Sequence, residues 1–217
     1  MLSPDQIAAF LLTSILLTSI LLTATPGPDN LMVLGVGASR GRRLALAFAL
    51  GCACGCLSHT VLAVLGVSAM LVASPLAFTA LKVAGGAYLL WLGIGALRSR
   101  GVARVPSGDG TGVPVAGSAW QHFFKGVLAN AINPKVVLFF LSFLPQFVAP
   151  AQGNVPGQMA VLGVLFTLQA AVLFGLLALF SGTVGQWLQR RPGAGLWLDR
   201  LTGAIFIALG VRMVMSR

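Results

Sequence analysis

Two short polar stretches interrupt long apolar segments of this sequence, and each carries one charged side chain. The first is Thr25-Pro26-Gly27-Pro28-Asp29-Asn30, and the second is Asn130-Ala131-Ile132-Asn133-Pro134-Lys135. A carboxylate can take up a proton or pair with an ammonium group, whereas an ammonium group can pair with a carboxylate. Charged side chains are costly inside apolar segments, so each stretch is a candidate functional site.

The prolines in both stretches predict breaks in helices. A proline removes a backbone donor and clashes with the preceding turn, so Pro134 frees the carbonyl of Asn130. Carbonyls freed within a bilayer must face protein or a wet cavity. Simpler alternatives remain open: the prolines only kink a helix, Asp29 caps a half-helix that starts near Leu31, and Lys135 extends toward the membrane surface.

The composition indicates that these breaks lie in a membrane protein. Of the 217 residues, 57% are hydrophobic and only 8% are charged, and the mean hydropathy is +0.94. A soluble domain needs more surface charge than this. The formal net charge of +10 is explained by basic loops between spans, and no motif indicates binding to nucleic acid.

The apolar runs predict an all-α, polytopic fold with six membrane spans. The first and fourth spans contain the breaks, and a polar linker at 98–119 follows the third span. The predicted spans are residues 6–38, 44–71, 76–97, 120–148, 158–187 and 196–214. The turns after spans one, three and five carry the loop arginines, which places them in the cytoplasm and both termini outside.

The order of the spans predicts an inverted repeat within a single transmembrane domain, residues 1–217. Residues 1–97 and 120–217 each contain one broken span followed by two continuous spans. Because three is an odd number, the second half enters the membrane in the opposite direction. Matching broken helices in such repeats mark a substrate site near the middle of the membrane. Two charged partners are then available to Lys135, Asp29 and the carboxylate of a bound substrate, and they need not exclude each other.

One face of the second span combines packing residues with a histidine. Gly51 and Gly55 form a small-residue pair that lets another helix approach closely, and His59 follows on the same face. His59 either lines a pathway or is a neutral histidine hydrogen-bonded to a neighbouring helix. Three cysteines lie at 52, 54 and 56. Their odd count argues against disulfides, and a soft-metal site would need more ligands.

Both polar stretches, the Gly51–Gly55 segment and the Leu81–Leu89 segment resemble the lysine exporter (LysE) and homoserine/threonine exporter (RhtB) family. The resemblance covers nearly the whole chain. It implies a transporter rather than an enzyme, without a cofactor, that exports amino acids or close derivatives across the bacterial inner membrane. It also implies that an ion gradient drives export, for which protons are the expected ion.

The resemblance leaves some features open. Members often carry a polar residue where Cys56 stands here, which puts a coupling role for span two in doubt. A metal-cation exporter is the alternative function, and the exposed glycine faces make a homodimer plausible. The candidate substrate- or ion-binding residues are Thr25, Pro26, Gly27, Pro28, Asp29, Asn30, Gly55, His59, Asn130, Asn133, Pro134 and Lys135.

Overall fold

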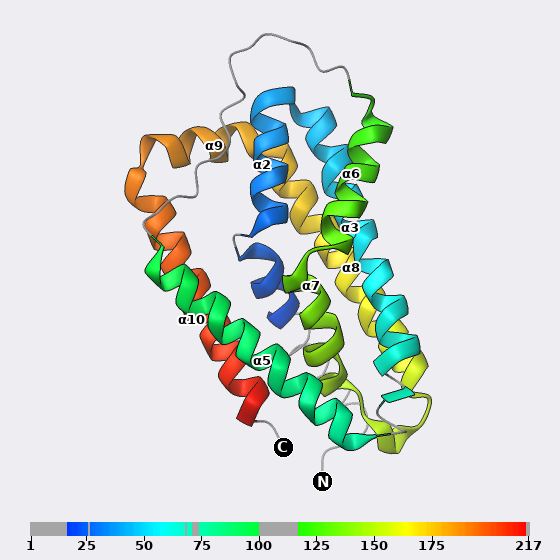
Figure 1. Ribbon diagram of the computed structural model, residues 1–217. Helices are drawn as coiled ribbons and strands as arrows, with labels where there is room; N and C mark the ends of the chain where they lie inside the picture. Colours follow the sequence, from blue (N-terminus) through cyan, green and yellow to red (C-terminus); the bar gives the residue numbers. More distant parts are fainter. Residues whose placement is uncertain (1–16, 26, 68, 71–73, 100–116, 216–217) are drawn as a thin grey trace.

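The computed structural model describes residues 17–25, 27–67, 69–70, 74–99 and 117–215. Within these ranges the chain is helical and has no β-strand (Figure 1). The N-terminal helical segment at 17–24 leads to α2 (Pro28–Arg40), α3 (Arg42–Leu62) with a π-helical turn η1 (Ala63–Val67), and α5 (Pro75–Arg98). The second half contains α6 (Ala119–Ala131), α7 (Pro134–Leu138) with η2 (Phe139–Phe143) and η3 (Leu144–Phe147), η4 (Pro150–Gln152), α8 (Val155–Leu179), α9 (Ser181–Arg190) and α10 (Pro192–Met215).

Four of the described helices are long and apolar enough to cross a membrane: Arg42–Val67, Leu76–Arg98, Val155–Leu179 and Gly193–Met215. A fifth span results if Ala119–Ala131 and Pro134–Phe147 count as one helix, bent by 52° at the predicted second break. The predicted first span begins within residues 1–16, which lie outside the described residues, as does most of the 98–119 linker.

The end of the fifth predicted span differs from the expectation. The helix was predicted to continue to Trp187, but α8 ends at Leu179. Phe180 has φ −97° and ψ 8°, which turns the chain out of the helical direction. The ten residues of α9 then form a separate helix with apolar and polar faces. Such a helix suits a membrane interface, whereas a spanning helix needs an apolar surface along its length.

Glycines bring two pairs of helices into close contact. A Cβ on Gly51 would lie 2.8 Å from the Phe123 carbonyl carbon, so α3 and α6 touch along their backbones. A Cβ on Gly203 would lie 2.7 Å from the Gly93 carbonyl oxygen, which joins α10 to α5. The sequence predicted the close approach of a helix at Gly51, and the structure confirms it.

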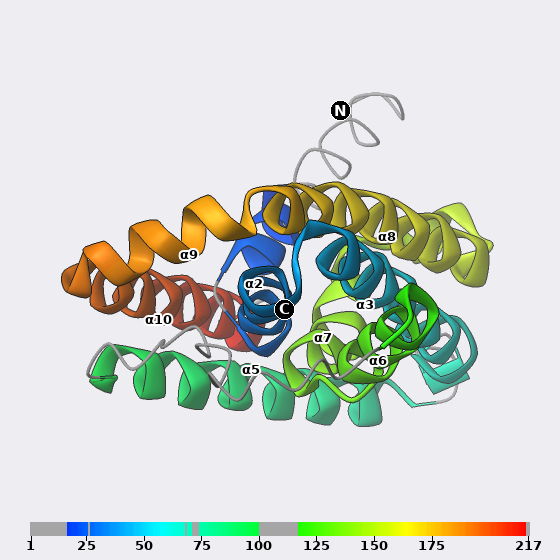
Figure 2. The same ribbon diagram turned by 90° about the horizontal axis from the view of Figure 1, so that it is seen from above.

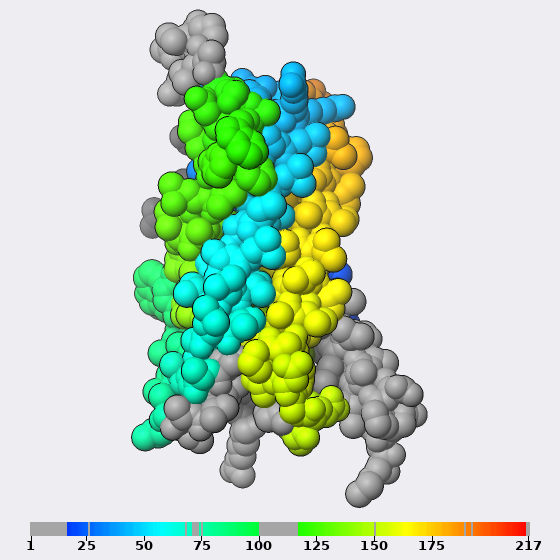
Figure 3. Space-filling model, turned by 90° about the vertical axis from the view of Figure 1, so that its right-hand side faces the viewer, coloured from blue at the N-terminus to red at the C-terminus, as the bar shows by residue number. Residues whose placement is uncertain are grey.

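The helices surround α2 and the two breaks. From above, α5 and α10 lie on one side of α2, and α3, α6 and α8 lie on another (Figure 2). On the outer face, α3 runs between α6 and α8 (Figure 3). The C-terminal end of α2, the start of α6 and α9 lie at one end of the molecule, opposite the end of α10 (Figure 1). The basic turn between α2 and α3 thus lies at the same end as the start of α6.

Candidate functional site

The first break separates the helical segment at 17–24 from α2. The Thr25 hydroxyl donates to the carbonyl of Leu21 and closes the end of the first segment. Gly27 is extended, with φ −161° and ψ 179°, and Pro28 occupies the first turn of α2. No side chain caps this helix, so the alternative in which Asp29 caps a half-helix is wrong. Pro26 lies outside the described residues.

The second break satisfies most of its own polar groups. The Asn133 side chain caps α7 by accepting a hydrogen bond from the Lys135 backbone N–H at 3.1 Å. Pro134 follows at the first position of the helix, as its missing donor allows. The freed Asn130 carbonyl accepts from the Asn133 N–H at 2.9 Å and contacts His59 Nε2 at 3.0 Å. Because a carbonyl only accepts, Nε2 carries the proton in that contact.

Two hydrogen bonds join the breaks across about one hundred residues of sequence. Asn130 Nδ2 donates to Asp29 Oδ2 at 2.8 Å, and Lys135 Nζ donates to the Thr25 carbonyl at 2.9 Å. Asp29 is 3% exposed and Lys135 is 7% exposed. The second oxygen of Asp29, Oδ1, has no hydrogen-bond partner among the described residues. A buried, half-satisfied carboxylate therefore lies beside a buried ammonium group.

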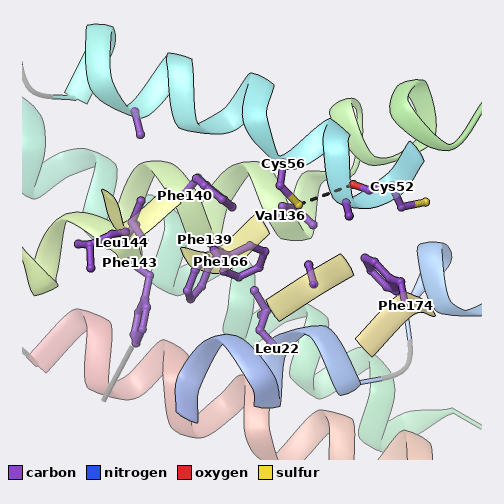
Figure 4. Packing of buried hydrophobic residues seen from close by; sticks show 14 of the residues in the cluster. Leu22, Cys52, Cys56, Val136, Phe139, Phe140, Phe143, Leu144, Phe166 and Phe174 are labelled. Carbon is purple, nitrogen blue, oxygen red and sulfur yellow. Dashed lines mark hydrogen bonds between the residues drawn. The ribbon is translucent and has the colours of Figure 1, made fainter. Parts of the chain in front are cut away.

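A small cavity lies between the breaks, with a volume of about 10 Å³. That is close to the space needed by one water molecule. Its polar wall contains both charged groups, and its apolar wall includes Leu22 of the first segment beside Phe166 of α8 (Figure 4). The lining residues are Leu22, Thr23, Gly27, Asp29, Asn30, Cys56, Asn130, Asn133, Lys135, Val136, Phe166 and Phe174. Such a volume excludes an amino acid, so the site is closed in this conformation.

A family comparison identifies the class of protein that carries this arrangement. A family model described as LysE type translocator matches residues 20–217. The chain belongs to the LysE type translocator family. It is therefore a multi-pass membrane transporter and not an enzyme, and the resemblance inferred from the polar stretches is confirmed.

Relatives of this LysE-family protein align along most of their length. An uncharacterized membrane protein of Vibrio cholerae serotype O1 is 32% identical over 217 residues, 96% of each chain. A protein named threonine efflux protein in Escherichia coli K12 is 31% identical, covering 89% of this chain and 92% of its own. A protein named homoserine/homoserine lactone efflux protein in Salmonella typhimurium is 30% identical over 96% of each chain. No solved structure matches the chain.

Of the residues predicted for the site of this LysE-family translocator, two lie behind the cavity wall. Gly55 packs against α6, where a Cβ would lie 2.8 Å from the Cβ of Asn130. His59 is 1% exposed, and its Nε2 is hydrogen-bonded to the Asn130 carbonyl of α6. This is the alternative in which the histidine is bonded to a neighbouring helix. Both residues hold Asn130 in place. Thr25 contributes its carbonyl, and Pro28 and Pro134 shape the backbone.

Sequence reasoning missed several contributors to the site, among them Thr23, Gln169 and Phe206. Thr23 links two helices, because its carbonyl accepts from Asn30 Nδ2 at 2.9 Å and its hydroxyl accepts from Gln169 Nε2 at 2.8 Å. Lys135 Nζ also lies 5.5 Å from the centre of the Phe206 ring in α10. Thr23 and Gln169 are polar residues in apolar helices, which was an available signal. The contact with Phe206 depends on tertiary structure and has no local signal.

The cysteines contribute one sulfur atom to the cavity. Cys56 lines it, with Sγ 3.5 Å from Asn130 Oδ1, whereas Cys52 is buried elsewhere and Cys54 is exposed. In the part of the chain that the structure describes, no group of three or more His, Cys, Asp or Glu residues could hold a metal ion. The cavity thus offers one carboxylate, one ammonium group, amides and aromatic rings.

Proposed function

We propose that this LysE-family transporter exports amino acids or close derivatives across the bacterial inner membrane, driven by the proton gradient. The observation that carries the proposal is the meeting of both helix breaks around one closed cavity with a single buried carboxylate and a single buried ammonium group. These groups complement the two charges of an amino acid. The names of the threonine and homoserine efflux relatives support the same substrate class.

The two charged groups suggest how an amino acid binds. The substrate ammonium pairs with Asp29, whose Oδ1 atom has no described partner. The substrate carboxylate pairs with Lys135 Nζ and replaces its bond to the Thr25 carbonyl. The N-terminal end of α7 also faces the cavity, through its cap Asn133 and through Lys135. Helix N-terminal ends favour a carboxylate, so at α7 the backbone and Lys135 act on the same substrate group.

Export requires the closed cavity to open alternately toward each side of the membrane. We assign this movement to two inverted repeats, residues 1–97 and 120–217, joined by the cytoplasmic linker at 98–119. Pairs of helices at matching positions in the two halves pack together, α3 with α8 and α5 with α10, and this supports the assignment. Rocking of one half against the other would expose the cavity at either end.

Proton coupling fits Asp29 better than other groups of the site. Among the described residues Asp29 is the one carboxylate that lines the cavity. When Asp29 binds a proton it becomes neutral and loses its attraction for the substrate ammonium. Uptake of a proton from outside would then release the amino acid there, and loss of the proton inside would restore the site.

Orientation follows from the basic end of the molecule, which we place in the cytoplasm, with both termini outside. A fluorescent protein that folds only in the cytoplasm, fused after Arg217, tests this placement. The fusion should stay dark, and a fluorescent fusion at normal expression would show that the orientation is inverted.

The function itself is tested by a growth panel. Cells expressing the protein are challenged with single amino acids or dipeptides in excess, and extracellular accumulation is measured. Expression should confer resistance to at least one amino acid and raise its external concentration. The matched control is the Lys135→Ala variant at equal membrane abundance, which should do neither. Resistance to divalent cations without amino-acid efflux would instead favour the metal-exporter alternative.

A further inference from the structure

A second, larger hollow lies on the side of the molecule, between α2 and α6. Its volume is about 500 Å³, and it is open, unlike the cavity at the breaks. Phe48 of α3 forms its floor and is 2% exposed. Polar contacts join α2 and α6 at both ends of this groove: Asp29 with Asn130 at the breaks, and Arg40 with His122 at the basic end.

The walls of the groove are apolar and turned outward. Met32 on α2 is 45% exposed, Leu128 on α6 is 63% exposed, and Ile132, which directly follows α6, is 70% exposed. In a membrane-spanning protein, exposed apolar side chains on spanning helices face lipid tails. An amino acid in transit would find few polar partners along these walls. A hydrocarbon chain, by contrast, would cover them.

The basic end of the same groove carries two cationic side chains. Arg40 and Lys125 line it and are exposed. His122 is 2% exposed, and its Nδ1 lies 3.1 Å from the Ser118 carbonyl, so Nδ1 is the donor and Nε2 accepts from Arg40 Nη1 at 3.4 Å. His122 therefore orients the guanidinium at the mouth of the groove. Among the residues that the structure describes, no acidic side chain lines the groove.

We propose that this groove binds one anionic phospholipid, with its phosphate at Arg40 and Lys125 and an acyl chain along Met32, Leu128 and Ile132. Basic pockets between membrane helices on the cytoplasmic side bind such headgroups. The lipid bridges α2, which begins at the first break, to α6, which ends at the second. The proposal concerns binding alone and does not depend on which solute is transported.

The test uses the full-length protein purified in detergent and native mass spectrometry with added phosphatidylglycerol or phosphatidylcholine. The wild type should retain one phosphatidylglycerol in preference to phosphatidylcholine. In the Arg40→Gln/Lys125→Gln variant the affinity should fall roughly 30-fold, since each charge contributes about fivefold. The matched control, Arg42→Gln/Arg43→Gln, removes two charges from the same end but outside the groove, and should bind like the wild type.

A second variant tests the apolar wall without changing charge. Ala129→Phe should fill the groove and weaken phosphatidylglycerol binding, while the thermal stability of the protein is measured in parallel. Equal affinity for both lipids, equal losses in the two double variants, or displacement of the lipid by inorganic phosphate would each overturn the proposal.

Discussion

The two helix breaks are alike in sequence but differ in how their polar groups are satisfied. At the second break, Asn133 caps α7, and His59 of α3 donates a hydrogen bond to the freed Asn130 carbonyl. The backbone groups of this break are therefore bound by its own residues and by α3. At the first break, no side chain caps α2. The Thr25 carbonyl and the Asp29 carboxylate instead bind groups that the second break supplies.

This difference suggests that the two breaks have different roles in transport. The second break is a fixed frame that presents Asn130 and Lys135. The first break has local hydrogen bonds from Thr25 and Asn30, but its Thr25 carbonyl and Asp29 carboxylate are bound from across the cavity. A substrate could replace these two contacts with its own charges. A site whose polar groups are satisfied by exchangeable partners can bind and release without leaving buried groups unpaired.

The largest effect is expected for Lys135→Ala, which removes the buried ammonium group of the second break. Export should be abolished while the protein stays in the membrane, because α7 keeps its Asn133 cap. Lys135→Arg should not restore full export, since the planar guanidinium has a different shape. Efflux of the exported amino acid and membrane abundance are measured together.

The control for that experiment is Lys82→Ala, which removes a lysine from α5 that does not line the cavity. It should retain export. Normal efflux by a well-expressed Lys135→Ala variant would remove the second break from the mechanism.

The next largest effect is expected for Asp29→Asn. The new side chain keeps an oxygen that can accept from Asn130 Nδ2, so the local structure should hold, but it has no charge and cannot exchange a proton. We expect most of the export to be lost, together with its dependence on external pH. Efflux across a range of external pH values is the measurement.

Asp199→Asn is the matched control, because Asp199 accepts a hydrogen bond from Ser99 at 2.6 Å and lies outside the cavity. It should behave like the wild type. If Asp29→Asn exported at the full rate with an unchanged pH profile, the coupling role of Asp29 would be excluded.

A smaller effect is expected at Gly55, where α3 packs against α6 beside the second break. In Gly55→Ala the new Cβ would lie 2.8 Å from the Asn130 Cβ and 2.9 Å from the Val127 carbonyl oxygen. Overpacking of this kind costs about 1–3 kcal/mol. The purified variant should lose its folded, monodisperse form at a lower temperature than the wild type. Gly66→Ala, which meets nothing within 4 Å, should not, and equal shifts in the two variants would contradict close packing at Gly55.

The smallest effect is expected for Asn133→Ala, which removes the cap of α7. Loss of a capping side chain costs about 1 kcal/mol. Export should fall only partly, because Pro134 still ends the preceding helix and Lys135 remains. The comparison between the breaks would fail if Asn133→Ala were as severe as Lys135→Ala in the efflux assay at equal abundance.

The breaks themselves could be predicted from sequence because their causes are local. Proline restricts its own residue and the one before it, and Asn133 caps a helix only two residues away. The pairing across the cavity could not be predicted in the same way. Asp29 and Lys135 were considered as partners, but no ion pair joins them among the described residues, and Lys135 Nζ binds the Thr25 carbonyl. The partner of Lys135 is set by the three-dimensional arrangement of the two breaks, which has no local signal in the sequence.

The end of α8 is a second feature that could not be predicted from the sequence. The segment 158–187 contains no internal proline, so composition gave no reason to end the helix at Leu179. The reversal at Phe180 is a tertiary effect, although the polar face of Gln186 and Arg190 was visible in the sequence.

Binding of the exported amino acid to purified protein tests the central claim, that the two breaks form one site. Radiolabelled substrate is titrated onto the wild type, Asp29→Asn, Lys135→Ala and the double variant. Because both side chains bind the same molecule, each single variant should lose most of the affinity, and the double variant should lose little more than the worse single variant. Independent, additive losses, or wild-type affinity in either single variant, would contradict a shared site.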